Sequence, residues 1–77
     1  MSMTAKLVRM ANQIARNFEI HGEAEAVGET AEHIRKFWDP RMRDQIQAHV
    51  EAGGEGLTDI ALDAVKMLGP IHGAHSE

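Results

Sequence analysis

The chain contains no cysteine, and in a sequence of only 77 residues this absence strongly limits how a fold can be stabilised. A chain this short buries roughly 60% of the surface that its unfolded form exposes, so its own core contributes little stability. Small domains usually add disulfides, a structural metal or a partner. The lack of cysteine excludes disulfides, thiolate zinc sites, iron–sulfur ligation and cysteine nucleophiles. The sequence therefore favours a domain that associates with a partner or with itself.

Apolar residues recur at helical spacing along most of the chain. A first helix is expected from an N-cap at Thr4 to just before Gly22, with an apolar stripe at Leu7, Met10, Ala11, Ile14 and Phe18. Its opposite face carries Lys6, Arg9, Gln13 and Arg16. A second stripe comprises Ala24, Val27, Ala31, Ile34 and Trp38. Gly28 interrupts this second helix at a cost of about 1 kcal/mol relative to alanine. It is either a solvent-facing weak point, which we favour, or a point of close approach by another helix.

The dipeptide Asp39-Pro40 gives the clearest boundary. A residue before proline is disfavoured in the α conformation, so the second helix should end at about Trp38. Pro40 suits the first position of a third helix, with the Asp39 carboxylate as its N-cap. The face of that helix should carry Met42, Ile46, His49 and Val50, and Gly53-Gly54 should end it. A fourth helix is expected from near Thr58.

These boundaries predict an all-α fold, a small bundle of three to four short helices without a sheet. Residues 1–68 form the single helical domain and residues 69–77 a flexible C-terminal tail. The fourth helix carries Leu57, Ala61, Ala64 and Leu68 on one face, widened by Ile60 and Met67, while Leu62 and Val65 lie on a second face. Because a chain of this size has little interior to bury both faces, Leu62 and Val65 are predicted to contact another chain.

The composition and motifs argue against several functions. A net charge of -4 gives no general attraction to nucleic acid or anionic membranes, and no apolar run approaches a membrane span. We therefore expect no nucleic-acid or membrane partner and a cytoplasmic location. Gly53-Gly54-Glu55-Gly56 lacks the context of a phosphate-binding loop. His72 and His75 form a close pair in the tail without the three or four ligands of a stable metal site. The chain is expected to be no enzyme by itself and to bind no cofactor or metal.

The segment Arg35–Arg43 is the most informative. It contains four of the eight basic residues, together with the adjacent aromatics Phe37 and Trp38. Trp38 falls on the core stripe, whereas Phe37 lies on its shoulder. An exposed aromatic among arginines is typical of a protein interface and could also stack nucleic-acid bases. Alternatively, both aromatics are buried and the basic residues form a solvated face. The residues predicted to bind a partner are Arg35, Lys36, Phe37, Arg41, Met42, Arg43, Leu62 and Val65.

Three stretches of the sequence resemble the delta subunit of NAD-dependent formate dehydrogenase. They are Lys6–Ala15, His33–Met42 with its Phe-Trp-Asp-Pro-Arg-Met core, and Gly53–Leu57, and the resemblance covers about Lys6 to Leu68. It implies a non-catalytic accessory subunit that binds the catalytic subunit and supports its assembly, stability or cofactor loading. The implied enzyme carries a molybdenum or tungsten cofactor, iron–sulfur clusters, flavin and NAD in its larger subunits. Two alternatives stay open, a free-standing helical homodimer and a nucleic-acid-binding module that uses the Arg35–Arg43 patch.

Overall fold

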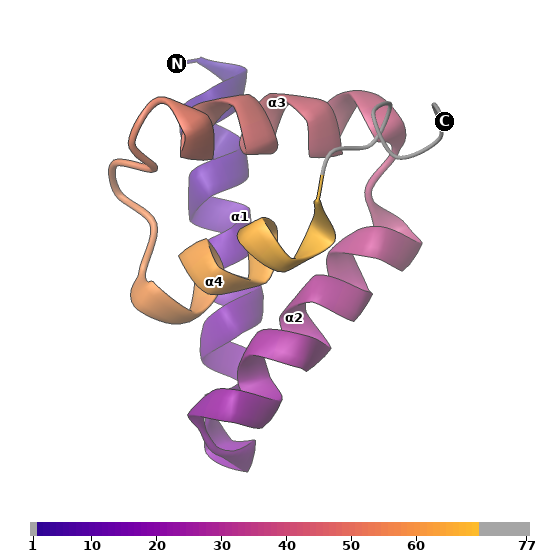
Figure 1. The fold of residues 1–77 in the computed structure, drawn as a ribbon, viewed down its shortest axis with the longest axis vertical. Coiled ribbons are helices and arrows are strands. Elements are labelled where there is room, and N and C mark those ends of the chain that lie inside the picture. The colour runs from indigo at the N-terminus through magenta and orange to yellow at the C-terminus, as the bar shows by residue number, and fades with distance from the viewer. Residues whose placement is uncertain (1, 70–77) are drawn as a thin grey trace.

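A computed structural model describes residues 2–69 as a bundle of helices (Figure 1). The elements are α1 (Met3–Phe18), the short 3₁₀ helix η1 (Glu19–His21), α2 (Glu23–Phe37), α3 (Pro40–Glu51) and α4 (Asp59–Leu68). No strand occurs among these residues, which confirms the predicted all-α class. Within the same range, no helix is both long and apolar enough to span a membrane. Residues 70–77 of the predicted tail, with His72 and His75, lie outside the described residues.

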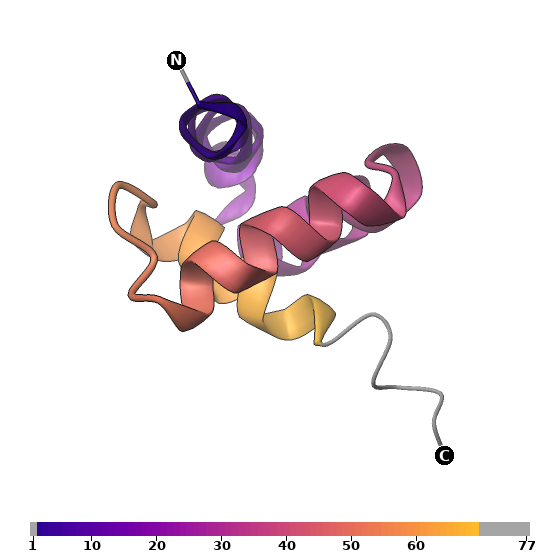
Figure 2. The same cartoon turned by 90° about the horizontal axis from the view of Figure 1, so that it is seen from above.

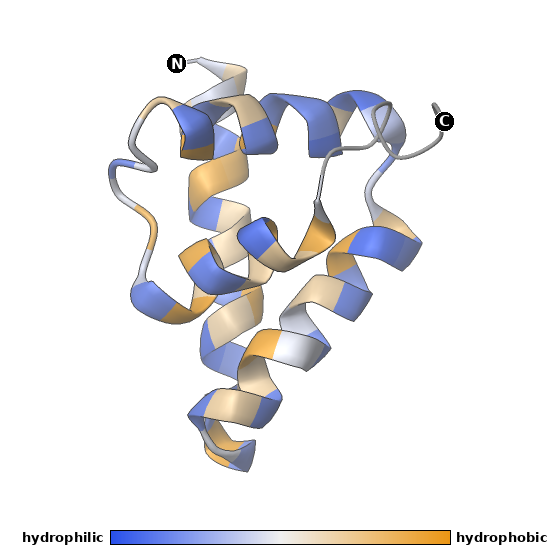
Figure 3. Cartoon of the chain, viewed as in Figure 1, coloured by the Kyte–Doolittle hydropathy of each residue, from blue (hydrophilic) through white to orange (hydrophobic). Residues whose placement is uncertain are grey.

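The helices pack around α4. The chain descends α1, turns through η1 and rises along α2, and α3 then crosses the upper end of the bundle (Figures 1 and 2). Helix α4 lies against α2 and also contacts α1 and α3. Every helix alternates polar and apolar positions (Figure 3), and the apolar positions meet in one core. That core contains Leu7, Ala11, Ala15, Ala26, Ile34, Trp38, Ile46, Ile60, Ala61 and Val65.

Side-chain caps begin three of the helices. Asp39 caps α3 as predicted, because its Oδ1 accepts from the amide of Met42 at 2.9 Å and Pro40 is the first helical residue. Thr58 caps α4, and its Oγ1 accepts from the amide of Ala61 at 3.3 Å. The prediction that Thr4 caps α1 was wrong. Ser2 does so, with its Oγ accepting from the amide of Ala5 at 3.1 Å.

Glycine ends two of the helical segments where predicted. Gly22 follows η1 with a φ of 99°. Beyond α3, the amides of Gly53 and Gly54 donate to the carbonyls of Val50 and His49 at 3.0 and 2.9 Å, which is the Schellman pattern. Gly54 is also tightly packed, since a Cβ there would lie 2.7 Å from Leu62 Cδ1. Residues 52–58 therefore form a connection that is packed against α4.

The second helix differs from its predicted stripe. Its buried residues are Ala26, Thr30, Ala31 and Ile34, whereas Ala24 is exposed. Because α2 packs against both α1 and α4, its buried face is not the single stripe that the sequence suggested. At Gly28 an added Cβ would meet nothing within 4 Å. The favoured explanation of this glycine is therefore supported, and no neighbouring helix makes a close approach to it.

Candidate functional site

The junction between α2 and α3 presents one aromatic ring to solvent and buries the next. Phe37 ends α2 with 69% of its surface exposed, whereas Trp38 is 5% exposed in the core. Trp38 and Asp39 are both extended, with ψ angles of 139° and 167°, so the chain leaves the helical path between the two aromatic residues. The predicted positions of Phe37 and Trp38 are confirmed, and the alternative in which both are buried is wrong.

Phe37 belongs to a row of rings that continues to the end of α1. Its ring centroid lies 4.7 Å from that of His33, which lies 6.3 Å from Phe18. Phe18 in turn lies 6.2 Å from His21 in η1. We call Phe18, His21, His33 and Phe37 the ring row. Their sequence spacing reveals only the His33–Phe37 pair, four residues apart on one helix. The contacts with Phe18 and His21 depend on how α1 and η1 pack against α2. The sequence does not predict this packing.

The basic residues near Phe37 differ in how they are paired. Arg35 Nη1 lies 2.6 Å from Glu32 Oε1, and Lys36 Nζ lies 3.9 Å from Glu32 Oε2. Arg41 is exposed and takes part in no ion pair between described residues. Arg43 is half-buried, and its Nε is buried without a hydrogen-bond partner. Arg41 is therefore the most available cation of the segment.

Three other predicted partner-binding residues pack within the chain. Met42 is half-buried against the core. Val65 is 1% exposed in the core, and the half-buried Leu62 packs on Gly54. Helix α4 is apolar on two faces because it contacts all three of the other α-helices. The reason for placing Leu62 and Val65 in a contact with another chain is thereby removed, and we leave both out of the proposed surface.

His21 is held beside an acidic residue of α2. Its Nδ1 lies 2.7 Å from Glu29 Oε1, and both side chains are partly exposed. The hydrogen bond to Glu29 and the charge of that carboxylate raise the pKa of His21 above its ordinary value. This hydrogen bond ties η1 to α2 at one end of the ring row. No group of three or more histidine, aspartate or glutamate side chains within residues 2–69 is arranged to hold a metal ion.

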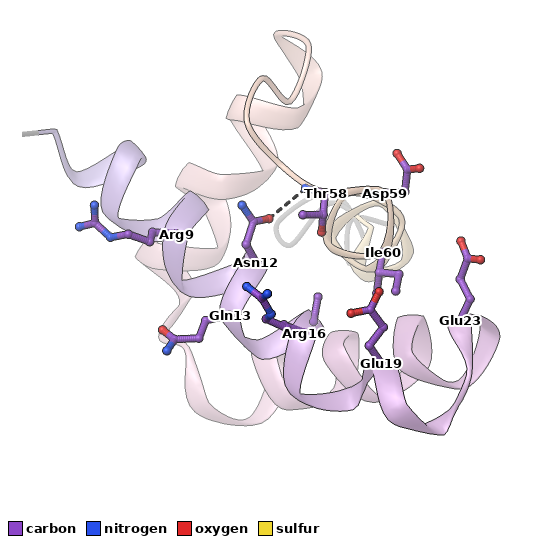
Figure 4. A pocket seen from close by; sticks show the side chains of 10 residues that line it. Arg9, Asn12, Gln13, Arg16, Glu19, Glu23, Thr58, Asp59 and Ile60 are labelled. Carbon is purple, nitrogen blue, oxygen red and sulfur yellow. Dashed lines mark hydrogen bonds between the residues drawn. The ribbon is translucent and has the colours of Figure 1, made fainter.

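A groove of about 830 Å³ lies on another side of the molecule, between α1 and the start of α4 (Figure 4). Asn12 positions the two elements. Its Nδ2 donates to the carbonyl of Gly56 at 2.9 Å, and its Oδ1 accepts from the amide of Thr58 at 2.9 Å. No local signal in the sequence marks Asn12, because its partners are more than forty residues away along the chain.

Comparison with protein families gives one match that covers most of the chain. Residues 6–65 match the family model described as the NADH-dependent formate dehydrogenase delta subunit, FdsD. The matched range includes the Arg35–Arg43 segment, the whole ring row and the connection before α4. Comparisons with curated proteins and with solved structures gave no match.

Proposed function

The chain belongs to the NADH-dependent formate dehydrogenase delta subunit family, and on that premise we propose that it docks on the catalytic subunit through the surface around Phe37. Membership of the family implies association with the formate dehydrogenase complex. In this proposal the chain is a non-catalytic subunit. Its binding supports the assembly, stability or cofactor loading of the catalytic subunit.

The exposure of Phe37 is the observation that carries the proposal. A phenylalanine with 69% of its surface in water loses the free energy that its burial would provide, and binding recovers it. His33 packs against one side of the ring and limits its freedom, so little side-chain entropy is lost on docking. Arg41 lies four residues further on and can form planar, paired hydrogen bonds with a carboxylate of the partner. Aromatic and arginine side chains together are characteristic of interface hot spots.

We place the redox cofactors of the complex in its other subunits. A chain without cysteine has no thiolates with which to ligate an iron–sulfur cluster. The proposed partner enzyme holds the molybdenum or tungsten cofactor, the iron–sulfur clusters, the flavin and the NAD site. On this account the delta subunit contributes a binding surface and no reacting group.

At the surface around Phe37, the charge arrangement favours a protein partner over nucleic acid. Arg35 and Lys36 are both paired with Glu32, and the chain has a net charge of -4. A nucleic-acid-binding patch would instead offer several unpaired cations along a phosphate backbone.

Gel filtration tests the proposed function. The chain is run alone and then with the formate dehydrogenase catalytic subunit, and we expect the two to co-elute as one complex. Separate elution at concentrations well above micromolar would contradict the proposal. If the chain forms a stable dimer that does not bind the catalytic subunit, the homodimer alternative is supported. Oligonucleotide binding that weakens steeply with salt would support the nucleic-acid alternative.

A further inference from the structure

Helix α1 carries a stripe of three basic residues and one glutamine on an otherwise acidic chain. Lys6, Arg9, Gln13 and Arg16 follow one another at spacings of three or four residues and are all exposed. Residues 3–18 contain no aspartate or glutamate, although the whole chain has a net charge of -4. None of the three cations takes part in an ion pair between the described residues. The stripe is thus a cationic surface that no carboxylate within residues 2–69 neutralises through an ion pair.

Two of these cations line the groove between α1 and α4. Arg9 and Arg16 border it, and the buried side chains of Ala15 and Ile60 contribute to its lining (Figure 4). Asn12 fixes the position of the α4 terminus relative to α1 through its two hydrogen bonds. A charged border around a small apolar area resembles the rim and centre of a protein interface.

The other side of the groove is acidic. Glu19, Glu23 and Asp59 line it. Glu23 and Asp59 lie in the first turns of α2 and α4, where the helix dipole stabilises a carboxylate, whereas Glu19 is the C-cap residue of α1 and gains no such stabilisation. The dipole of α1 stabilises the cation of Arg16 in its last turn. Arg9 lies in the middle of α1, and neither the dipole nor an ion pair accounts for it.

We propose that the basic stripe of α1, along one border of this groove, binds an acidic segment of a protein in the formate dehydrogenase complex, with the carboxylates of that segment facing Lys6, Arg9 and Arg16. This inference rests on the proposed function, which identifies the formate dehydrogenase complex as the partner. Charge complementarity selects the occupant, because α1 presents exposed cations and no carboxylate to it. Glu19, Glu23 and Asp59 across the groove confine an acidic segment to the α1 border and repel a broader polyanion such as nucleic acid. The start of α4, which borders the groove, lies away from the α2–α3 junction in both views (Figures 1 and 2). The delta subunit thereby has two docking surfaces and can bridge two parts of the complex.

Neutral substitutions in the stripe test this inference in the assembled complex. The double variant Arg9→Gln/Arg16→Gln is compared with wild type and with Lys66→Gln. Lys66 is the matched control, because it is an exposed cation in the last turn of α4, as Arg16 is in α1. We expect the double variant to bind formate dehydrogenase on the order of tenfold more weakly at low salt, with a smaller difference at high salt. Lys66→Gln should bind like wild type, and circular dichroism should show all three folded.

A photo-crosslinking side chain in place of Gln13 identifies the occupant. We expect it to capture a peptide of the complex that is rich in aspartate and glutamate. Wild-type affinity in the double variant, or capture of a peptide without acidic residues, would overturn the inference and leave the Phe37 surface intact. Capture of an oligonucleotide would also overturn it. If the wild-type chain forms no complex at all, the proposed function fails and the inference fails with it.

Discussion

Individual polar side chains fix the geometry on which both proposed surfaces depend. Asn12 is the clearest case, since its side-chain amide hydrogen-bonds both a backbone carbonyl and a backbone amide just before α4 begins. Its neighbour Gln13 is exposed, and its side chain makes no hydrogen bond with another described residue. The two residues therefore form a natural pair for comparison. One holds α4 against α1, and the other only faces solvent.

We predict that Asn12→Ala lowers the free energy of unfolding by about 1–3 kcal/mol. The substitution removes two hydrogen bonds and leaves the Gly56 carbonyl and the Thr58 amide without their partners. Gln13→Ala is the control and should change stability by less than about 0.5 kcal/mol. Urea denaturation followed by circular dichroism measures both. Equal stabilities of the two variants would show that water replaces the Asn12 side chain at no cost.

We predict that the His21–Glu29 pair makes stability depend on pH in one direction. Because the pKa of His21 is raised in the folded state, the stabilisation is fully present below the unfolded-state pKa and is lost as the pH rises through the folded value. An NMR titration of the His21 ring should give a pKa above the ordinary value. Glu29→Gln should lower it, because it removes the charge that favours the protonated ring. An unchanged titration midpoint in Glu29→Gln would contradict the assignment.

The sequence predicted the elements well and their contacts less well. Local signals such as Asp39-Pro40, Thr58 and the glycines at 22, 53 and 54 placed the helix boundaries, because capping and positive φ are decided within a few residues. Helical spacing also predicted that Trp38 lies in the core and that Phe37 lies at its edge. The burial of Val65 and the ring row could not be predicted in the same way, since both depend on which helices meet. Helix α4 is apolar on two faces because it contacts α1, α2 and α3, while Asp63, Lys66 and Met67 on its remaining side stay exposed.

Substitution of two glycines separates local backbone effects from packing. Gly28 lies inside α2 and Gly22 precedes it with a φ of 99°, and an added Cβ at either site meets nothing within 4 Å. We predict that Gly28→Ala raises the free energy of unfolding by about 0.5–1 kcal/mol, because alanine is the better helix former. Gly22→Ala should lower it, because an L side chain is strained at that φ. Thermal unfolding of both variants tests this. Loss of stability in Gly28→Ala would mean that α2 is tightly packed at that position.

The whole molecule combines a small core with two exposed surfaces of different chemistry. The ring row runs from the end of α1 and η1 to the end of α2, and Arg41 lies at the start of α3, whereas the basic stripe follows α1 beside α4. A chain of 77 residues buries a smaller fraction of its surface on folding than a larger domain does. A large part of its surface is therefore left for binding partners. This agrees with a subunit whose fold supplies binding surfaces within a formate dehydrogenase complex.

The most direct test of the central claim is the affinity of the Phe37→Ala variant for the catalytic subunit. Met67→Ala is the control, since Met67 is also apolar and 58% exposed but lies on α4. Isothermal titration calorimetry should show that Phe37→Ala weakens binding by about 1–3 kcal/mol, while Met67→Ala binds like wild type. Circular dichroism should show both variants fully helical. Equal affinities of wild type, Phe37→Ala and Met67→Ala would contradict docking through Phe37.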